Sequence, residues 1–316
     1  MVGEFDFIAR HFRPLAGEGA MELRNDGATM SLPEGEELVL SSDTMVEGLH
    51  FLPDDPARTV AQKLLRCNLS DLAAMGSSPR HYMLNVSVPV GRHYDEAWFA
   101  EFAAGLAEDQ ERFGITLLGG DTTGSPSPLM LNVTILGAVR RGETLRRDGG
   151  RPGDGVWVTG TLGRAALGLQ VRLGKIDASP DGILVQSYRI PSPRVGLSLY
   201  GIVSAAMDIS DGLVQDCGHI AEESGTAITL FEEALPLSAE VKAYLPDWRE
   251  TILLGGDDYE LLLTCPVEQE EALQTHCRAH AVPVTKIGKV TEGQGVTMLD
   301  KNHEPIRFTR TGWQHF

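Results

Sequence analysis

Five short segments that carry aspartate, each near the end of an apolar run, most constrain how this chain can fold. The segments are Asn25-Asp26-Gly27, Ser41-Ser42-Asp43-Thr44, Asn68-Leu69-Ser70-Asp71, Gly119-Gly120-Asp121-Thr122 and Asp208-Ile209-Ser210-Asp211-Gly212. An apolar run forms a buried strand or helix, so a polar residue at its end can point its side chain into a cleft. Carboxylate and hydroxyl oxygens are the ligands that Mg2+ prefers. The pattern therefore predicts a site for several magnesium ions and for phosphate.

A single aspartate in such a segment has a simpler interpretation, because its side chain often caps a helix or stabilises a turn. The recurrence favours the metal site. The aspartates concerned are Asp26, Asp43, Asp71, Asp121, Asp208 and Asp211. If these carboxylates converge, they repel one another unless cations neutralise them. With a nucleoside triphosphate of about −4 and a phosphate monoester of about −2, the total is roughly −12, which about four or five Mg2+ ions would largely offset.

Composition excludes several other classes of protein. The chain has 316 residues, 42% of them apolar, which is enough for a full core and predicts two domains. Its 27 Lys and Arg against 44 Asp and Glu give a net charge of 27 − 44 = −17, which argues against a nucleic-acid surface. The four cysteines lack the spacing of a zinc site and suit reduced thiols.

The chain also lacks the signals of secretion and membrane insertion. Its first residues have no basic region followed by an apolar stretch, and no window approaches the roughly 20 apolar residues of a membrane span. We expect a cytoplasmic protein that binds neither membranes nor nucleic acids.

Apolar periodicity predicts an α/β architecture in both halves. In the first half we expect strands over 37–43, 82–88, 115–118 and 129–139 and helices over 56–75 and 95–113. In the second half we expect strands over 156–159 and 259–264 and helices over 163–173, 194–205 and 212–224. The glycine-rich, charged stretch 140–155 separates them, so the predicted domains are 1–150 and 151–316.

Four further candidates each have two interpretations. Gly119-Gly120 allows close approach of phosphate to the backbone or simply makes a tight turn. Arg147 holds nucleotide phosphates or is a solvated arginine of the linker. His50 recognises substrate or packs in a loop, and Trp313 faces a cationic heterocycle or covers apolar surface. The P-loop and Rossmann glycine patterns do not occur, which disfavours both of those enzyme classes.

These segments, in this order along nearly the whole chain, resemble the thiamine-monophosphate kinase family of the aminoimidazole-ribonucleotide-synthetase-like superfamily. The matching stretches include Gly48-Leu49-His50-Phe51, Asn68 to Gly76, Asp208 to Leu213, Gly255-Gly256-Asp257-Asp258-Tyr259-Glu260-Leu261 and the terminal Gly312-Trp313-Gln314-His315-Phe316. The resemblance implies transfer of the ATP γ-phosphoryl group to thiamine monophosphate, which yields ADP and thiamine diphosphate. It also implies two domains, each a mixed sheet packed with helices, and a homodimer joined through the first-half sheets.

The resemblance carries residue roles as well. The metal positions it implies are Asp26, Ser41, Ser42, Asp43, Asp71, Asp121, Asp208 and Asp211. The nucleotide positions are Gly120, Asp121, Arg147 and Ser210, and the thiamine-phosphate positions are His50, Asp257, Glu260 and Trp313. Those expected to carry the catalysis are Asp43, Asp71, Asp121, Arg147 and Asp211. One departure is Asn25, which stands where the family usually has aspartate and leaves the number of bound ions open.

The expected chemistry needs no general base, because a phosphate monoester with a second pKa of about 6 is largely dianionic near neutral pH. Catalysis should then consist of positioning and electrostatic stabilisation, with direct in-line transfer. A two-step route through a phosphorylated protein residue is the mechanistic alternative. Three other functions compete: a different ATP-dependent member of the superfamily, a non-catalytic nucleotide-binding module, and a metal-dependent phosphohydrolase.

Overall fold

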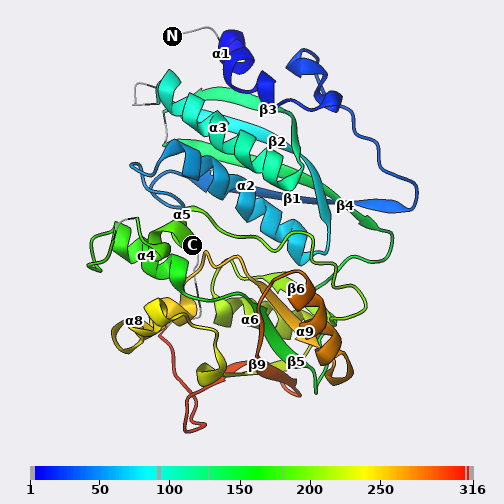
Figure 1. The fold of residues 1–316 in the computed structure, drawn as a ribbon, viewed down its shortest axis with the longest axis vertical. Coiled ribbons are helices and arrows are strands. Elements are labelled where there is room, and N and C mark those ends of the chain that lie inside the picture. The colour runs from blue at the N-terminus through cyan, green and yellow to red at the C-terminus, as the bar shows by residue number, and fades with distance from the viewer. Residues whose placement is uncertain (1–3, 91–93, 127, 180, 310–311, 313–316) are drawn as a thin grey trace. The chain divides into compact units, whose positions relative to one another are not determined.

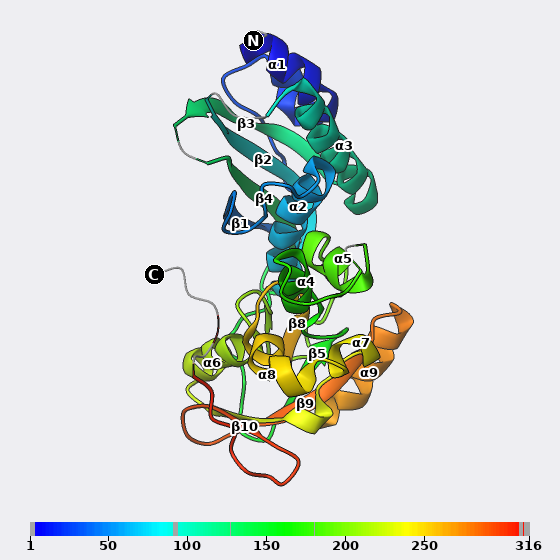
Figure 2. The ribbon, with the colours of Figure 1, turned by 90° about the vertical axis from the view of Figure 1, so that its left-hand side faces the viewer.

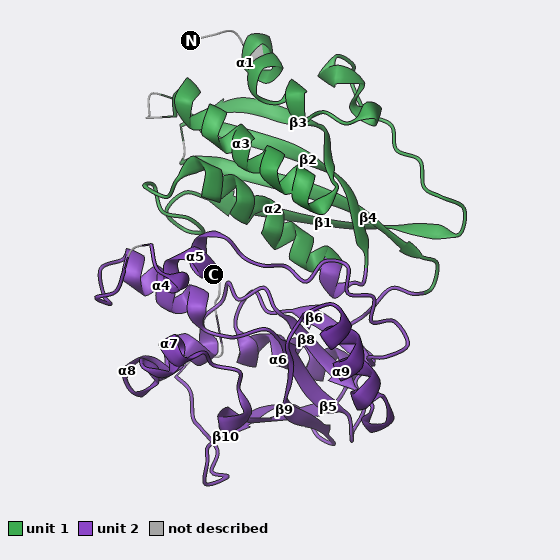
Figure 3. Ribbon diagram, viewed as in Figure 1, with its two compact units in different colours: residues 1–72, 77–142 green, residues 73–76, 143–316 purple. Residues whose placement is uncertain are grey.

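A computed structural model describes residues 4–90, 94–126, 128–179, 181–309 and 312 of the chain (Figure 1). The chain divides into two compact units, residues 1–72 with 77–142 and residues 73–76 with 143–316 (Figure 3). Residues 73–76 and 143–150, both within the predicted first domain, belong to the second unit. Within the described ranges, no helix is long and apolar enough to cross a membrane.

The first unit is a four-stranded mixed sheet covered on one face by two long helices (Figures 1 and 2). The strand order is β1-β4-β2-β3, with β2 and β3 parallel and the other neighbours antiparallel. Its strands are β1 Glu36–Val46, β2 Ser78–Pro89, β3 Thr116–Ser125 and β4 Met130–Arg140. Its helices are α1 Glu4–His11, η1 Arg13–Leu15, η2 Glu18–Leu23, α2 Ala57–Ala74 and α3 Glu96–Phe113.

The two faces of this sheet follow from the alternation of side chains along a strand. On β1, Val39 and Met45 are buried on the helix-covered face, whereas Leu38 and Leu40 are exposed on the other. The leucines of α2 recur at helical spacing and are fully buried, as the sequence pattern predicts. One face of the sheet is thus a core, and the other is open.

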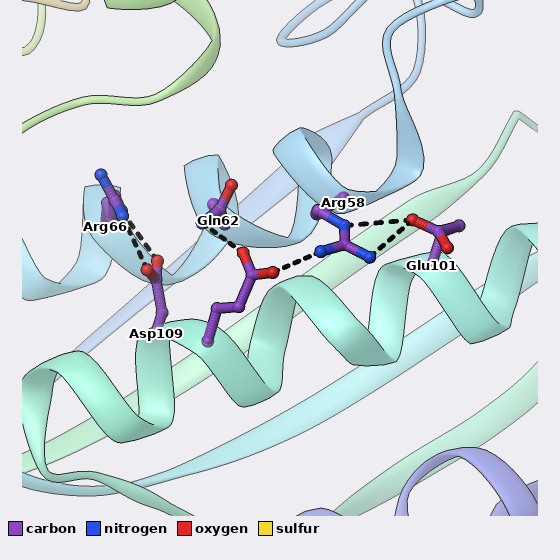
Figure 4. A network of polar contacts seen from close by, with 6 residues as sticks. Arg58, Gln62, Arg66, Glu101 and Asp109 are labelled. Atoms are coloured by element: carbon purple, nitrogen blue, oxygen red, sulfur yellow. Dashed lines mark hydrogen bonds and ion pairs between the residues drawn. The ribbon is translucent and has the colours of Figure 1, made fainter.

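A polar network joins α2 to α3 (Figure 4). Arg66 donates two hydrogen bonds to Asp109, at 2.8 and 2.7 Å, and both side chains are almost fully buried. Toward the helix ends, Arg58 pairs with Glu101 at the surface. A buried, doubly bonded pair constrains the relative position of two helices, so this network helps to fix α2.

The second unit is a six-stranded mixed sheet with helices on both faces, in the order β10-β7-β9-β5-β8-β6. Only β10 and β7 pair in parallel. Its strands are β5 Gly155–Thr159, β6 Ala205–Asp208, β7 Ala227–Phe231, β8 Leu261–Cys265, β9 Val284–Thr291 and β10 Gly295–Leu299. Its helices are α4 Arg164–Arg172, α5 Ile183–Arg189, α6 Leu213–Ser224, η3 Glu232–Ala234, α7 Ala239–Lys242, α8 Leu245–Leu254, η4 Val267–Gln269 and α9 Glu270–Ala279.

The burial of β5 shows that both faces of this sheet are covered. Val156 and Val158 belong to one apolar cluster, while Trp157, between them, belongs to another. Every residue of β5 is buried, which is typical of a strand between two layers. The prediction of two α/β halves with mixed sheets is confirmed.

One predicted helix is wrong. Residues 194–205 form turns and extended segments, and Ala205 begins strand β6. Gly196 and Gly201 have left-handed φ angles of 87° and 78°, which a helix interior does not allow. The apolar residues of this stretch imitate helical spacing, but the glycines end each turn. The other ten predicted elements all overlap an observed helix or strand of the same type.

Candidate active site

The first group of predicted site residues lies where β1 contacts α2. Ser41 Oγ donates a hydrogen bond to Asp71 Oδ2 at 2.5 Å. Asn68, which is fully buried, accepts a bond from the Asp43 backbone N–H at 3.2 Å and anchors its amide on the Leu64 carbonyl. Ser41 and Asp43 are two residues apart on β1, so the pleat of the strand places their side chains on the same face of the sheet. The fold therefore brings the side chains of Ser41 and Asp71 together and places the Asp43 backbone beside Asn68.

This group suits a magnesium ion by its donor chemistry. Ser41 and Asp71 supply a hydroxyl and a carboxylate oxygen side by side, and such hard oxygen donors are the ligands that Mg2+ takes. Across the described part of the chain, no three His, Cys, Asp or Glu side chains are close enough to hold a metal by themselves. Mg2+ is often held by one or two carboxylates together with waters and substrate phosphates, so a sparse oxygen set still fits it.

Ser42 lies on the opposite side of the sheet from this group. Its hydroxyl is 3.2 Å from the Val133 carbonyl oxygen and 3.0 Å from Thr134 Oγ1. Asn132 Nδ2 also donates to it at 3.2 Å. The two serines that the sequence pairs as metal positions thus present their hydroxyls to different faces.

A cavity of about 190 Å³ brings together the glycine segment and the first acidic segment. Asp26 and Asp121 both line it, and both residues are exposed. Gly120 has a φ of 153°, and a Cβ there would lie 1.7 Å from the Leu84 carbonyl oxygen, so only glycine fits. The polar part of its lining also includes Asn25, Gly27, Gly119 and Thr122, and its apolar part includes Ile8, Phe12, Ala20, Leu23, Leu117 and Leu118.

Backbone strain precedes Asn25 and Asp26 in the chain. Met21, Glu22 and Leu23 have φ angles of 49°, 57° and 56°, a left-handed run that side-chain-bearing residues rarely adopt. Such strain persists only where surrounding structure enforces it, and it often marks ligand sites.

His50 is fixed by the turn that follows β1. Its Nδ1 accepts the Val46 backbone N–H at 3.0 Å, so the ring proton resides on Nε2 in the neutral form. Its carbonyl oxygen accepts from Lys63 Nζ, a buried amine, at 3.0 Å. His50 is therefore an oriented hydrogen-bond donor.

In the second unit, the segments 208–211 and 257–260 lie side by side. The Asp257 N–H donates to the Ser210 carbonyl at 2.9 Å, and the Tyr259 N–H donates to the Ile209 carbonyl at 2.8 Å. Asp257 and Tyr259 have left-handed φ angles of 71° and 50°. Two segments that are remote in sequence thus form one strained polar region.

Asp216, which the sequence analysis missed, supports this region. Its Oδ2 accepts the N–H groups of Asp211 and Gly212 at 3.2 and 3.1 Å. Burial, with the charges of Asp208 and Asp211, raises the pKa of Asp216 to about 8. The sequence does carry a sign of this residue. Asp216 lies among the buried apolar residues of α6, where an acid without a partner is not expected.

Glu260 is held by protein groups. Arg194 donates to both of its oxygens, and Thr159 Oγ1 donates to Oε2 at 2.7 Å. The neighbouring Asp258 accepts the Gly163 N–H, and burial raises the pKa of this carboxyl well above its usual range. Arg194 was not identified from the sequence, because its pairing with Glu260 spans 66 residues.

The two remaining predicted site residues are Arg147 and Trp313. Arg147 is exposed, and its carbonyl oxygen accepts from Ser224 Oγ at 2.9 Å, near the end of α6. Trp313 lies outside the described residues.

Comparison with known proteins matches both halves of the chain. Residues 24–139 match the model of the AIR synthase related protein N-terminal domain, and residues 151–301 match that of the C-terminal domain. The thiamine-monophosphate kinase of Caulobacter vibrioides is 42% identical over 323 aligned positions, which cover 99% of this chain and 90% of that protein.

Solved structures agree. The crystal structure of thiamine-monophosphate kinase from Stenotrophomonas maltophilia K279a has a TM-score of 0.81 and 39% identity, covering 87% of this chain and 89% of that one. AaThiL complexed with AMPPCP and TMP has a TM-score of 0.78 and 30% identity, covering 100% and 97%. The similarity thus spans both units.

Proposed function

Because the chain belongs to the thiamine-monophosphate kinase family, we propose that the residue groups described above serve the reaction of that family. This reaction is the ATP-dependent phosphorylation of thiamine monophosphate to thiamine diphosphate, with release of ADP. The family inferred from the sequence motifs is confirmed. The observation that best supports the function is the full-length similarity to AaThiL, whose structure holds AMPPCP and TMP.

Chromatography of the reaction products tests the function. With ATP, Mg2+ and thiamine monophosphate, the purified protein should form ADP and thiamine diphosphate in equal amounts. Release of inorganic phosphate without thiamine diphosphate would identify a phosphohydrolase instead. Binding without turnover would identify a nucleotide-binding module.

Magnesium is the metal that we propose for the acidic groups. Bound Mg2+ would supply positive charge that offsets the negative charge of the phosphates during transfer. The residues proposed to hold it are Asp26, Ser41, Asp43, Asp71, Asp121, Asp208 and Asp211. Ser42 is left out of this set because its hydroxyl lies on the other face of the sheet.

The substrate contacts are proposed on the same basis. Gly120 and Asp121, which both line the cavity of the first unit, are proposed to contact the nucleotide phosphates. Arg147 and Ser210 complete the proposed nucleotide set, and His50, Asp257, Glu260 and Trp313 form the proposed thiamine-phosphate set. The oriented Nε2–H of His50 suits a phosphate oxygen.

We propose direct in-line transfer, because the acceptor phosphate is already ionised and needs no side chain to remove a proton. The work of the protein is then to hold two anions in line. A chiral γ-phosphorus should be inverted in a single transfer. Net retention would require a phosphorylated enzyme intermediate and would reject the direct route.

A homodimer through the open face of the first-unit sheet is also proposed. This face carries four exposed apolar side chains, which are Leu38, Leu40, Met83 and Met130 at 39%, 54%, 41% and 37% exposure. Neighbouring apolar groups on an uncovered sheet favour burial against a partner. Sedimentation should give a dimer for the wild type and a monomer for Leu40→Asp. Val267→Asp, at an exposed apolar position of the second unit, is the matched control and should stay dimeric.

We further infer that the enzyme works in the reducing cytoplasm. Cys217, Cys265 and Cys277 are buried thiols outside any disulfide, and burial raises the pKa of Cys265 to about 12 and that of Cys277 to about 11. Such thiols suit a compartment without disulfide formation. Fractionation of cells that produce the protein would test the location.

A further inference from the structure

We propose that Ser224 is a positioning residue for Arg147, because its hydroxyl holds the turn that presents this arginine. The inference rests on the proposed function, which assigns Arg147 to the nucleotide phosphates. Ser224 Oγ donates a hydrogen bond to the Arg147 carbonyl oxygen at 2.9 Å and accepts the Gly150 N–H at 3.0 Å. One hydroxyl from a distant segment thus joins the two ends of the turn 147–150.

Helix α6 fixes the place of the Ser224 hydroxyl. Ser224 is the last residue of this helix, and Gly225 ends it with a left-handed φ of 64°. The Gly225 N–H bonds back onto carbonyl groups of the last turn, as is usual where glycine caps a helix. Cys217 and Ile220 are fully buried in the core of the second unit, so they anchor the helix from which Ser224 reaches the turn.

The backbone around Arg147 lies against the start of β6. The Ala206 N–H donates to the Arg146 carbonyl oxygen at 2.8 Å. At Gly149, a Cβ would lie 1.8 Å from the Ser204 carbonyl oxygen, so this close approach requires glycine. Arg147 stands between these two contacts in the chain, and its own carbonyl oxygen is bonded from α6. The turn is therefore attached to both β6 and α6.

The neighbours of Arg147 leave its charge available. Arg146 donates to both carboxylate oxygens of Asp148, at 2.9 and 2.5 Å. The charge of the acid that follows Arg147 in the chain is thereby offset by the residue that precedes it. Arg147 itself is exposed, and an exposed guanidinium can bind a phosphate through two parallel hydrogen bonds.

A fixed turn matters because binding would otherwise have to order it. An arginine on a loose loop loses backbone and side-chain freedom when it meets a phosphate, and this loss weakens binding. The two hydrogen bonds of Ser224 restrict the turn before the ligand arrives. Ser224 therefore contributes to nucleotide affinity through Arg147.

Steady-state kinetics and calorimetry on Ser224→Ala test this role. Loss of two neutral hydrogen bonds should raise the KM for ATP by about 3- to 10-fold and should weaken the binding of AMPPCP by the same factor. Arg147→Met, which removes the charged contact itself, should weaken AMPPCP binding by roughly 10- to 100-fold. The KM for thiamine monophosphate should stay unchanged in Ser224→Ala. Ser224→Thr keeps the hydroxyl and should recover most of the loss.

A double variant separates positioning from a general effect on the fold. If Ser224 acts only through Arg147, Ser224→Ala should cause no further loss of AMPPCP affinity in the Arg147→Met background. Multiplied effects would show that Ser224 acts independently of Arg147 and would overturn the proposal. Thr59→Val is the matched control, because it removes a hydroxyl that donates to the Pro56 carbonyl oxygen at the same distance of 2.9 Å. Its AMPPCP affinity should equal that of the wild type.

Unchanged AMPPCP affinity of Ser224→Ala, beside a weakened Arg147→Met, would also overturn the proposal. If Ser224→Ala does not fold, as judged by circular dichroism, Ser224→Cys is measured in the same way, since a thiol is a weaker donor and acceptor. Binding of AMPPCP requires no turnover, so failure of this inference and failure of the proposed function can be told apart. A wild type that forms no thiamine diphosphate would refute the proposed function, whereas an active wild type with an unaffected Ser224→Ala variant would refute only this inference.

Discussion

Acidic side chains of this protein lie in two kinds of environment, which examples from the two units illustrate. In the first unit, Asp26 and Asp121 are exposed at a cavity, and Asp71 is only partly buried. In the second unit, Asp216 and Glu260 are 1% and 6% exposed and accept hydrogen bonds from backbone or arginine. Open carboxylates are available to cations, whereas buried ones hold the backbone and neighbouring side chains in place. For these five acids, burial and protein partners, more than motif membership, separate the open from the structural carboxylates; Asp208, a proposed metal position that is 3% exposed, does not follow this division.

The largest expected effect comes from an open carboxylate. Asp71→Asn should lower kcat by about 10²- to 10³-fold, because the transferred charge loses electrostatic stabilisation. The fold should persist in circular dichroism, since an amide oxygen can still accept the Ser41 hydrogen bond. Asp95→Asn, at the exposed cap of α3, is the control and should keep its turnover. Unchanged turnover of Asp71→Asn at limiting magnesium would remove this group from the site.

A buried carboxylate of the first unit should behave like those of the second. Asp109→Asn leaves the Arg66 charge buried without its partner, which typically costs about 3–5 kcal/mol of unfolding free energy. Glu101→Gln breaks an exposed pair with Arg58 that water screens, so it should destabilise the protein far less than Asp109→Asn. Urea titration measures both. Equal losses would show that burial does not separate structural from available acids in this protein.

The buried carboxyl of Asp216 should make the free energy of unfolding depend on pH. Its folded pKa of about 8 exceeds the ordinary value of 3.8, so the folded state keeps a proton that the unfolded state loses. This contribution is fully present below pH 4 and is lost as the pH rises toward 8, by at most about 1.4 kcal/mol per pH unit. Asp216→Asn should flatten that decline in buffer with EDTA. A parallel decline in wild type and variant would mean that Asp216 is ionised in the folded protein.

The sequence predicted the elements better than it predicted the side-chain partners. Helix 56–75 was recognised because its leucines recur at one face, and α2 spans Ala57–Ala74. The helix predicted over 194–205 was wrong because apolar spacing alone does not reveal glycines with left-handed φ angles. Local patterns carry periodicity, but they do not show where distant segments meet.

The site residues also show that local patterns do not reveal which distant side chains meet. Ser41 and Asp71 were both expected at the metal site, and the fold places their side chains in hydrogen-bond contact. The pairing of Glu260 with Arg194 depends on how a loop packs against β8, so it could not be read from spacing. Asp216 was passed over because a helical carboxylate normally signals a solvated face.

The smallest expected effect compares the two adjacent serines. Ser41→Ala should lower the apparent affinity for magnesium by several-fold, because it removes an oxygen beside Asp71. Ser42→Ala should change it less than about twofold, since its hydroxyl bonds Val133 and Thr134 on the other face and contributes only about 1 kcal/mol of stability. Magnesium titration of initial rates measures both. Equal effects would contradict the division between faces, because a residue on the open side of the sheet would then influence the ion as strongly as one beside the carboxylate.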